Sequence, residues 1–376
     1  MSNRFEAMSK TRQTALLVAS VMVFVVVMAL LAEGGMRIRQ AIRYGPAIGG
    51  GLETLFHIDP ATGLRLMVPG LRTSRLSSNS LGLRGPEIPL AKPEGTFRVA
   101  FLGASTTFCA EVSSDAMVWP SLVIDKLRAA SPGQKFDFIN AALPGYTLGS
   151  MQKILEKLVA PLKPDLIVIY EGHNDLTEIM AAAVWRQGIV FDTGDSGLSW
   201  LSRYSLLAYL VEKNILSLRR QRMAAGDSEK LRVPSETLAA PYEERLASLV
   251  RDARAVAKQV VLVTFATRVR AEQTPEEKQQ AGVTDLYYMP FRAPDDLVRD
   301  YAAVNEAMRR VARREGAALI EAATAIPADK QHFADSVHFS DAGSQMMADI
   351  VASGLATQVG IDGIRGRDGG ARRDGK

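Results

Sequence analysis

Short apolar strands alternate with amphipathic helices from residue 97 to residue 355, and this alternation constrains the fold more than any other feature. Strands are expected at 97–102, 136–139, 165–170, 260–265 and 318–320. Helices are expected around Trp119 to Leu127 and at 148–159, 241–258, 297–314 and 341–355. Strands that alternate with helices form a parallel sheet covered by helices on both faces. The sequence therefore predicts an α/β domain with about five parallel strands.

An uncharged apolar run at residues 14–32 predicts a membrane anchor. About 20 apolar residues suffice to cross a bilayer core. A buried core helix and a cleaved signal peptide are the alternatives. The run is longer than the ~7–15 apolar residues of a signal peptide, and Leu-Leu-Ala at 30–32 matches an A-x-A-like cleavage site poorly. Positive charges are balanced across the run, so they do not fix its orientation: Arg4, Lys10 and Arg12 precede it, and Arg37, Arg39 and Arg43 follow it.

The rest of the chain is expected to divide into a short N-terminal segment, a lead-in, two segments inserted in the domain and a tail. Residues 1–13 form a short N-terminal segment. Residues 33–95 form an extended lead-in to the domain, and its part 45–95 is rich in Gly, Pro and Ser. Within the domain, 177–240 is expected to be a helical insertion with a basic amphipathic helix near 204–223, and 270–295 a surface loop. Residues 359–376 are expected to be a disordered basic tail.

Composition excludes several classes of protein. The 45 basic and 41 acidic side chains nearly balance, and no dense basic stripe lies outside the tail, so no nucleic-acid partner is expected. The single cysteine, Cys109, excludes an internal disulfide framework and a Cys-based zinc site, and it is expected to be a small buried residue. The four histidines limit metal chemistry. No phosphate-binding glycine motif follows the first expected strand.

Polar residues follow the expected strands where a ligand would bind. In open α/β sheets, ligands bind beyond the carboxyl ends of the strands. Ser105 follows the first strand, Gly145 the second and Asn174 the third, while Asp335 and His338 lie just before the closing helix. These residues supply a nucleophile, oxyanion donors, a base and an orienting acid. Together they are the parts of an acyl-transfer site.

These segments resemble the SGNH hydrolases, also called GDSL-type esterases. The Ser, Gly, Asn and His for which that family is named match Ser105, Gly145, Asn174 and His338 in the same order, and its Asp-x-x-His motif matches Asp335 and His338. The resemblance covers approximately residues 97–355. Four blocks in the right order, each at a strand end or before the closing helix, make it specific.

Two departures from related patterns bear on the resemblance. Ala104 replaces the Asp of the Gly-Asp-Ser block, a position outside the catalytic set. Thr107 stands where the G-x-S-x-G elbow of the α/β-hydrolases requires glycine. The comparison therefore favours the SGNH group over the α/β-hydrolases.

The resemblance implies a three-layer α/β/α domain at 96–358 and a specific division of roles. The catalytic set would be Ser105, His338 and Asp335, and the oxyanion hole would comprise Ser105, Gly145 and Asn174. No metal or organic cofactor is implied. The substrate would be an acyl ester, O-acetyl or short-chain, with cell-envelope or exported polysaccharide or lipid as the alcohol portion. The expected location is a bacterial-type inner membrane, single-pass, with the domain outside the cytoplasm.

Several alternatives remain open at the level of sequence. The same layout serves carbohydrate O-acyltransferases, and a catalytically idle membrane accessory protein belongs to a further class. Neither the acyl chain nor the oligomeric state follows from the residues. Single residues also have structural alternatives. Ser105 could be a helix N-cap, and Gly145 and Asn174 could be turn residues. His173 could be the base instead of His338. Asp175 is expected to brace the turn after the third expected strand, and Asp341 is expected to be the N-cap of the last helix.

Overall fold

The computed structural model describes residues 8–44, 55–188, 198–225 and 231–359. The chain divides into two compact units. The first contains Met1–Thr54 and Gly194–Leu216, and the second contains Leu55–Thr193 and Ser217–Lys376. The tail expected at 359–376 lies outside the described residues from position 360 onward.

The second unit is built on a parallel sheet of five strands, as the sequence predicts. Their order is β4-β3-β5-β6-β7, so the first of them along the chain, β3, lies inside the sheet between β4 and β5. The strands are β3 (Thr96–Gly103), β4 (Lys135–Asn140), β5 (Leu166–Tyr170), β6 (Gln259–Val263) and β7 (Ala318–Ile320). Every residue of β5 is buried, which is typical of a strand covered on both faces.

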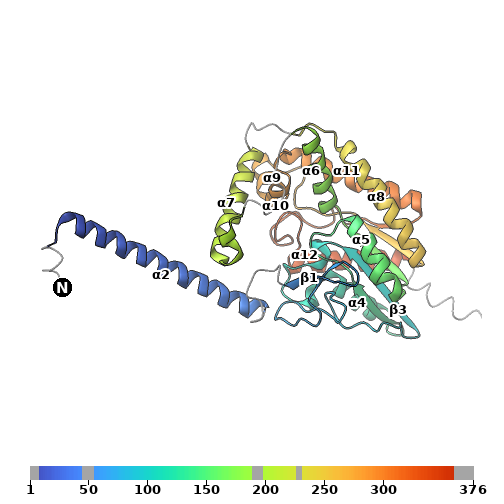
Figure 1. Cartoon of the computed structure of the whole chain (residues 1–376). Helices are drawn as coiled ribbons and strands as arrows, with labels where there is room; N and C mark the ends of the chain where they lie inside the picture. The colour runs from blue at the N-terminus through green and yellow to red at the C-terminus, as the bar shows by residue number, and fades with distance from the viewer. Residues whose placement is uncertain (1–7, 45–54, 189–197, 226–230, 360–376) are drawn as a thin grey trace, which may run out of the picture. The chain divides into compact units, whose positions relative to one another are not determined.

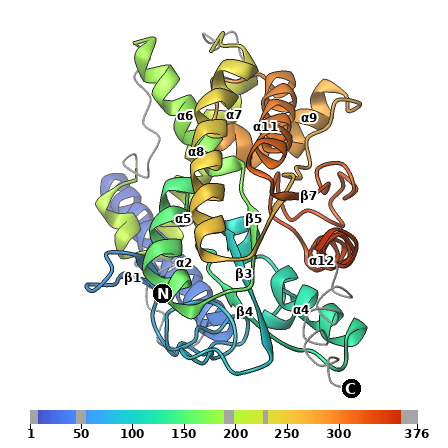
Figure 2. The ribbon, with the colours of Figure 1, turned by 90° about the vertical axis from the view of Figure 1, so that its right-hand side faces the viewer.

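Helices cover both faces of this sheet, which confirms the three-layer α/β/α fold (Figures 1 and 2). One face carries α5 (Leu148–Ile154), α8 (Ser235–Val256) and α11 (Pro294–Glu315). The opposite face carries α4 (Trp119–Ala130) and α12 (Asp341–Gly354), which pack against each other. Helix α6 (His173–Arg186) follows β5 and packs on α8.

The segment 270–295 is helical and partly buried, so the expectation of a surface loop is wrong. It contains α9 (Pro275–Ala281) and α10 (Val283–Tyr288). Thr274 accepts the backbone N–H of Glu277, and the Glu277 side chain accepts the backbone N–H of Thr274, a complete capping box. This pairing satisfies two free N–H groups at the start of α9 and stabilises a helix that the polar composition conceals.

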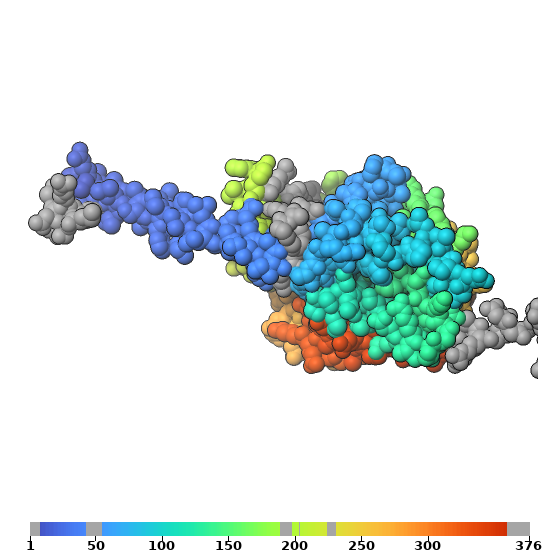
Figure 3. All heavy atoms as spheres, turned by 90° about the horizontal axis from the view of Figure 1, so that it is seen from below, coloured from blue at the N-terminus to red at the C-terminus, as the bar shows by residue number. Residues whose placement is uncertain are grey.

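Residues 55–95 belong to the second unit, in contrast to the extended lead-in expected at 33–95. Strands β1 (Phe56–Ile58) and β2 (Arg65–Met67) pair antiparallel. Met67 and Leu83 are fully buried. Lys92 contacts both carboxylate oxygens of Asp165 at 2.8 Å. Figure 3 shows this segment, in lighter blue, over part of the surface of the second unit. The apolar residues scattered among its glycines and prolines hold it there.

The first unit contains the apolar helix α2 (Lys10–Tyr44), which extends well beyond the predicted span at 14–32. It is long and apolar enough to cross a membrane, and none of its most apolar window is buried. The same unit contains η6 (Trp200–Arg203) and the first half of α7 (Leu206–Ala225).

Candidate active site

Ser105 lies at a sharp turn where β3 gives way to the short helix α3 (Ser105–Phe108). Gly103 permits this turn because a Cβ there would collide with the side chain of Thr107 and approach the Tyr170 carbonyl oxygen to 2.9 Å. Ala104 occupies the N-cap position and makes no capping bond, so Ser105 is not the N-cap. The Ser105 hydroxyl is therefore available for other contacts.

The structure brings Ser105, His338 and Asp335 into one hydrogen-bonded chain. Ser105 Oγ lies 2.8 Å from His338 Nε2, and His338 Nδ1 lies 2.7 Å from Asp335 Oδ2. Asp335 Oδ1 accepts the backbone N–H groups of Val337 and His338, both at 2.9 Å. These bonds fix the carboxylate so that its second oxygen faces the imidazole. The arrangement is that of a nucleophile, a base and a group that orients the base.

Neighbouring charges and hydrogen bonds shift the pKa values of Asp335 and His338 in opposite directions. Burial by itself would raise the pKa of Asp335, but the His338 hydrogen bond and charge outweigh it and hold the pKa well below its ordinary range. Burial would lower the pKa of His338, but the negative charges of Glu111 and Asp335, with the Asp335 hydrogen bond, raise it to about 9. The pair thus favours an imidazolium beside a carboxylate.

Gly145 lies in the loop that follows β4, and Asn174 lies in the first turn of α6, just after β5. Strands β4 and β5 are the two that flank β3. Gly145 has a φ of 81°, a left-handed conformation that favours glycine. Asn174 Nδ2 donates to the Tyr146 carbonyl oxygen at 2.9 Å, which links the start of α6 to the loop after β4. Because a primary amide has two N–H donors, this bond orients the side chain while using one of them.

Two buried carboxyl groups accept hydrogen bonds from the backbone of these segments. Glu171 Oε1 accepts the backbone N–H of Asn174 at 2.7 Å, and burial, with the nearby Asp175 charge, raises the pKa of Glu171 to about 8. Asp175 is fully buried, accepts the backbone N–H of Leu148 at 2.8 Å and pairs with Arg245 at 3.2 Å. It therefore joins the start of α5 to the start of α6, just after the third of the expected strands, a bracing position like the one expected from the sequence.

His173, the alternative base, belongs to a separate buried cluster. Its Nδ1 lies 2.7 Å from the Tyr301 hydroxyl and 3.2 Å from Asp285 Oδ1. The Tyr301 hydroxyl donates to Asp285 at 2.6 Å. The imidazole hydrogen-bonded to Ser105 is that of His338.

Comparison with known proteins identifies the family. The model of the GDSL-like lipase/acylhydrolase family matches residues 101–346. The chain belongs to the GDSL-like lipase/acylhydrolase family. This confirms the resemblance to SGNH hydrolases and supports ester hydrolysis as its class of activity. A search of curated proteins found no match.

Solved structures similar to this GDSL-like protein include two variants of an acetyl xylan esterase from Geobacillus stearothermophilus. One is 19% identical with a TM-score of 0.42 and covers 69% of this chain and 94% of its own. The other, a catalytic mutant, is 16% identical with a TM-score of 0.43 and covers 70% and 94%. An α/β hydrolase enzyme from the metagenome of Lake Arreo, Spain, is 19% identical with a TM-score of 0.41 and covers 69% and 95%.

Arg84, which sequence reasoning missed, clamps the turn that carries Ser105. Its side chain is 2% exposed, and its Nη1 donates to the carbonyl oxygens of Phe108 and Cys109, both at 2.6 Å. Its Nε donates to Asp115 at 2.7 Å. These bonds satisfy carbonyl groups at the C-terminal end of α3. No family motif contains this residue, and an arginine in a Gly- and Pro-rich segment gives no signal of burial.

The last helix begins differently from the sequence expectation. Ser340, not Asp341, is the N-cap of α12, and its hydroxyl accepts the backbone N–H of Gly343 at 3.2 Å. Asp341 instead accepts the backbone N–H of Ser113 at 2.8 Å. This contact joins the segment after Cys109 to the start of α12.

An open cavity of about 380 Å³ lies beside the loop of Asp335 in this GDSL-like domain. Its lining combines Ala334 and Ala342 with six polar residues, Arg75, Glu111, Ser113, Gln331, Ser340 and Asp341. Among the residues that the structure describes, no group of three or more His, Cys, Asp or Glu side chains is arranged to hold a metal ion.

Proposed function

We propose that this GDSL-like protein is a serine esterase that transfers an acyl group from an ester to water through Ser105. The observation that carries the proposal is the continuous hydrogen-bonded chain from Asp335 through His338 to Ser105. The family supports ester hydrolysis. Cys109 is no competing nucleophile, because it is buried and burial raises the pKa of its thiol to about 12.

In the proposed reaction, His338 Nε2 takes the proton of the Ser105 hydroxyl as Oγ attacks the ester carbonyl. The developing oxyanion accepts hydrogen bonds from the backbone N–H groups of Ser105 and Gly145 and from the Asn174 amide. Asp335 holds Nδ1 protonated and stabilises the imidazolium. His338 then protonates the leaving alcohol, and water activated by the same base cleaves the acyl-enzyme.

The proposed substrate is an O-acetyl or short-chain acyl ester of a hydroxyl-rich alcohol, such as cell-envelope or exported polysaccharide. Polar side chains that line the cavity beside the Asp335 loop, among them Arg75, Glu111 and Gln331, could hydrogen-bond such an alcohol. Fluorophosphonate labelling of the purified protein, with acetyl release from acetylated polysaccharide, tests the proposal. Absence of labelling in folded protein would favour an idle accessory protein. Acetyl transfer to added sugar in preference to water would identify a transferase.

We also propose that α2 anchors the protein and that the domain lies outside the cytoplasm. The length, apolarity and exposure of α2 support anchoring, and an extracytoplasmic side suits the proposed substrate. Protease added to intact spheroplasts is expected to digest the body of the protein, from residue 45 onward. Protection until lysis would place the domain in the cytoplasm. Release of the body without detergent would indicate a cleaved signal peptide.

Asn174→Ala is expected to lower kcat by about 10²–10³-fold with little change in KM, because the amide would meet charge that develops only in the transition state. Steady-state kinetics with a short-chain aryl ester measure this effect. Because the Asn174 side chain also donates to the Tyr146 carbonyl oxygen, a thermal melt must accompany the kinetics. A rise in KM with unchanged kcat would instead indicate a role in substrate binding.

Activity is expected to rise with pH through the pKa of His338, because only the neutral imidazole can accept the Ser105 proton. The raised pKa places the acidic limb of kcat/KM above the ordinary imidazole value of about 6.5. Glu111→Gln removes a negative charge that stabilises the imidazolium, so it should move this limb to lower pH. Glu244→Gln, a change on the exposed surface of α8, is the matched control. An unmoved limb in Glu111→Gln would show that Glu111 does not tune the base.

A further inference from the structure

Large apolar side chains are exposed together on η6 and α7, outside the catalytic site. The rings of Trp200 and Tyr204 are 73% and 72% exposed and meet edge to face at 6.4 Å. The exposed members of this 200–218 surface are Trp200, Leu201, Tyr204, Leu210, Val211, Ile215 and Leu218. Apolar side chains grouped in this way mark an interaction surface, in contrast to single exposed residues.

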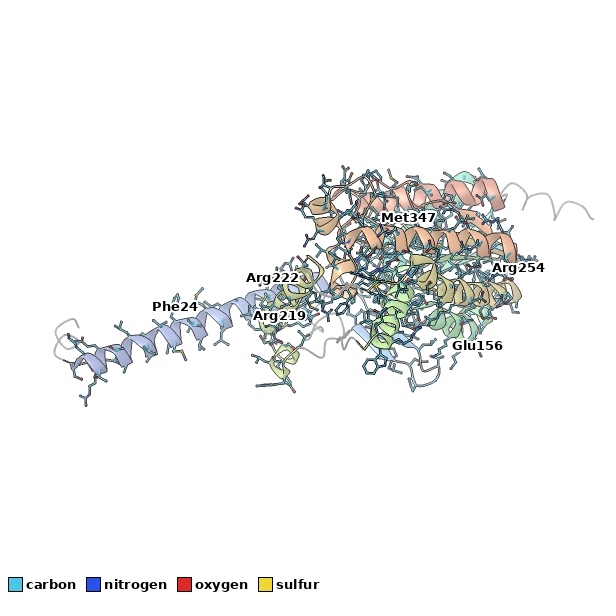
Figure 4. All side chains as sticks on the ribbon, turned by 90° about the horizontal axis from the view of Figure 1, so that it is seen from above. Phe24, Glu156, Arg219, Arg222, Arg254 and Met347 are labelled. Carbon is cyan, nitrogen blue, oxygen red and sulfur yellow. The ribbon has the colours of Figure 1, made fainter. Side chains whose placement is uncertain are left out.

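The apolar residues of α7 form a stripe along one side of the helix. Val211, Ile215 and Leu218 follow one another at spacings of four and three residues, which places them on one face. Arg222 continues the stripe four residues later. Figure 4 shows Arg219 and Arg222 projecting from this later part of α7. A helix that combines an apolar face with basic side chains can lie in a membrane interface.

Hydrogen bonds hold this surface at the end of the apolar run of α2. Glu33 is the first residue after the uncharged run 14–32. Its carboxylate accepts the backbone N–H groups of Leu206 at 3.0 Å and Leu207 at 2.9 Å, and the Ser205 hydroxyl at 2.9 Å. Glu33 thus satisfies free N–H groups at the start of α7, a cap supplied by a distant helix.

A second hydrogen bond, from a residue one turn after Glu33, also attaches α2 to the start of the 200–218 surface. Arg37 donates to the Tyr204 carbonyl oxygen at 2.6 Å and pairs with Glu33 at 2.7 Å. All these partners lie in the first compact unit. The aromatic end of the 200–218 surface is therefore fixed beside the point where the uncharged run of α2 ends.

The position along α2 favours lipid as the occupant of this surface. As a helix, the run 14–32 is about 28 Å long, close to the ~30 Å of a bilayer core. The attachment through Glu33 then places Trp200 and Tyr204 at the membrane–water interface, where Trp and Tyr are enriched. Arg219 and Arg222 at the other end have the charge to meet anionic head groups.

We propose that the 200–218 surface lies in the interface of the same bilayer that α2 spans and contacts its acyl chains and anionic head groups. This inference rests on the proposed anchoring of α2. It adds a second membrane contact of a different kind, an in-plane helix that is attached to the spanning helix by Glu33 and Arg37.

Site-directed fluorescence of the full-length protein in vesicles tests this contact. The only native thiol, Cys109, is buried, and burial raises its pKa to about 12, so an introduced cysteine can be labelled selectively. Val211→Cys and Lys213→Cys place a nitrobenzoxadiazole probe on opposite faces of α7. The vesicles contain phosphatidylcholine and phosphatidylglycerol, with or without brominated acyl chains. The probe at 211 should emit at shorter wavelength and be quenched by brominated lipid, whereas the probe at 213 should not.

A probe at Phe24→Cys, on the apolar part of α2, separates the failure of this inference from the failure of anchoring (Figure 4). Quenching at 24 with equal exposure to water at 211 and 213 would overturn the inference and leave the anchor intact. A blue-shifted probe at 211 that brominated lipid does not quench would show cover by protein, such as a second copy, and would also overturn it. Lack of quenching at 24 would reject anchoring and the interfacial contact together.

Discussion

Replacing Ser105 with alanine is expected to abolish fluorophosphonate labelling and to lower kcat for a short-chain aryl ester by about 10⁴–10⁶-fold. The hydroxyl supplies the atom that would form the acyl-enzyme, and no neighbouring group can replace it. The turn should survive the change, because the Ser105 side chain makes no capping bond and Arg84 holds the carbonyl groups of Phe108 and Cys109. Labelling, kinetics and a thermal melt of the same preparation measure these effects.

Ser344→Ala is the matched control for this experiment. Ser344 is fully buried in the same domain, and its hydroxyl donates to the Met117 carbonyl oxygen at 2.6 Å and is not bonded to His338. Its loss should lower the melting temperature and leave labelling in place. Near-normal turnover by Ser105→Ala would reject Ser105 as the nucleophile.

Asp335→Asn is expected to lower kcat by as much as ~10⁴-fold in a protein that remains folded. The amide oxygen can still accept the N–H groups of Val337 and His338, so the loop should keep its shape. The amide NH₂ would then face His338 Nδ1 and favour the tautomer that carries its proton on Nε2. That tautomer cannot accept the Ser105 proton. The loss in kcat and a pH profile measured with the same ester test this reasoning.

Asp175→Asn separates this effect from the general cost of removing a buried carboxylate. Asp175 binds Leu148 and Arg245 and takes no part in the bonds of His338. Its replacement should reduce the melting temperature more than kcat. If Asp175→Asn abolished turnover in folded protein while Asp335→Asn did not, the acid of the proposed site would be misassigned.

The sequence was sufficient to predict the parallel sheet, because its strands are short apolar runs separated by amphipathic helices. It also placed Ser105, Gly145 and Asn174 at one edge, because parallel strands present their carboxyl ends on the same side of a sheet. His338 required the family motif, since it follows no predicted strand. Its contact with Ser105 depends on how α12 returns to the sheet, which no local pattern encodes.

The structural features that sequence reasoning missed depend on long-range contacts or on weak local patterns. Arg84 reaches the Ser105 turn from a segment whose composition resembles a linker, and only its burial shows that it belongs to the domain. The influence of Glu111 on His338 has no sequence pattern at all. Helix α9, by contrast, was detectable, because Thr274 and Glu277 have the spacing of a capping box.

The contact between Ser105 and His338 joins residues 233 positions apart, close to the two ends of the domain. During synthesis, Arg84 and the turn that carries Ser105 leave the ribosome while most of the domain is still untranslated, because Arg84 and Phe108 are only 24 positions apart. The proposed nucleophile would therefore exist long before the base that activates it. A nascent or truncated chain that ends before His338 would lack the proposed base and would be inert toward esters, and hydrolytic activity would appear only once the domain had been made and folded.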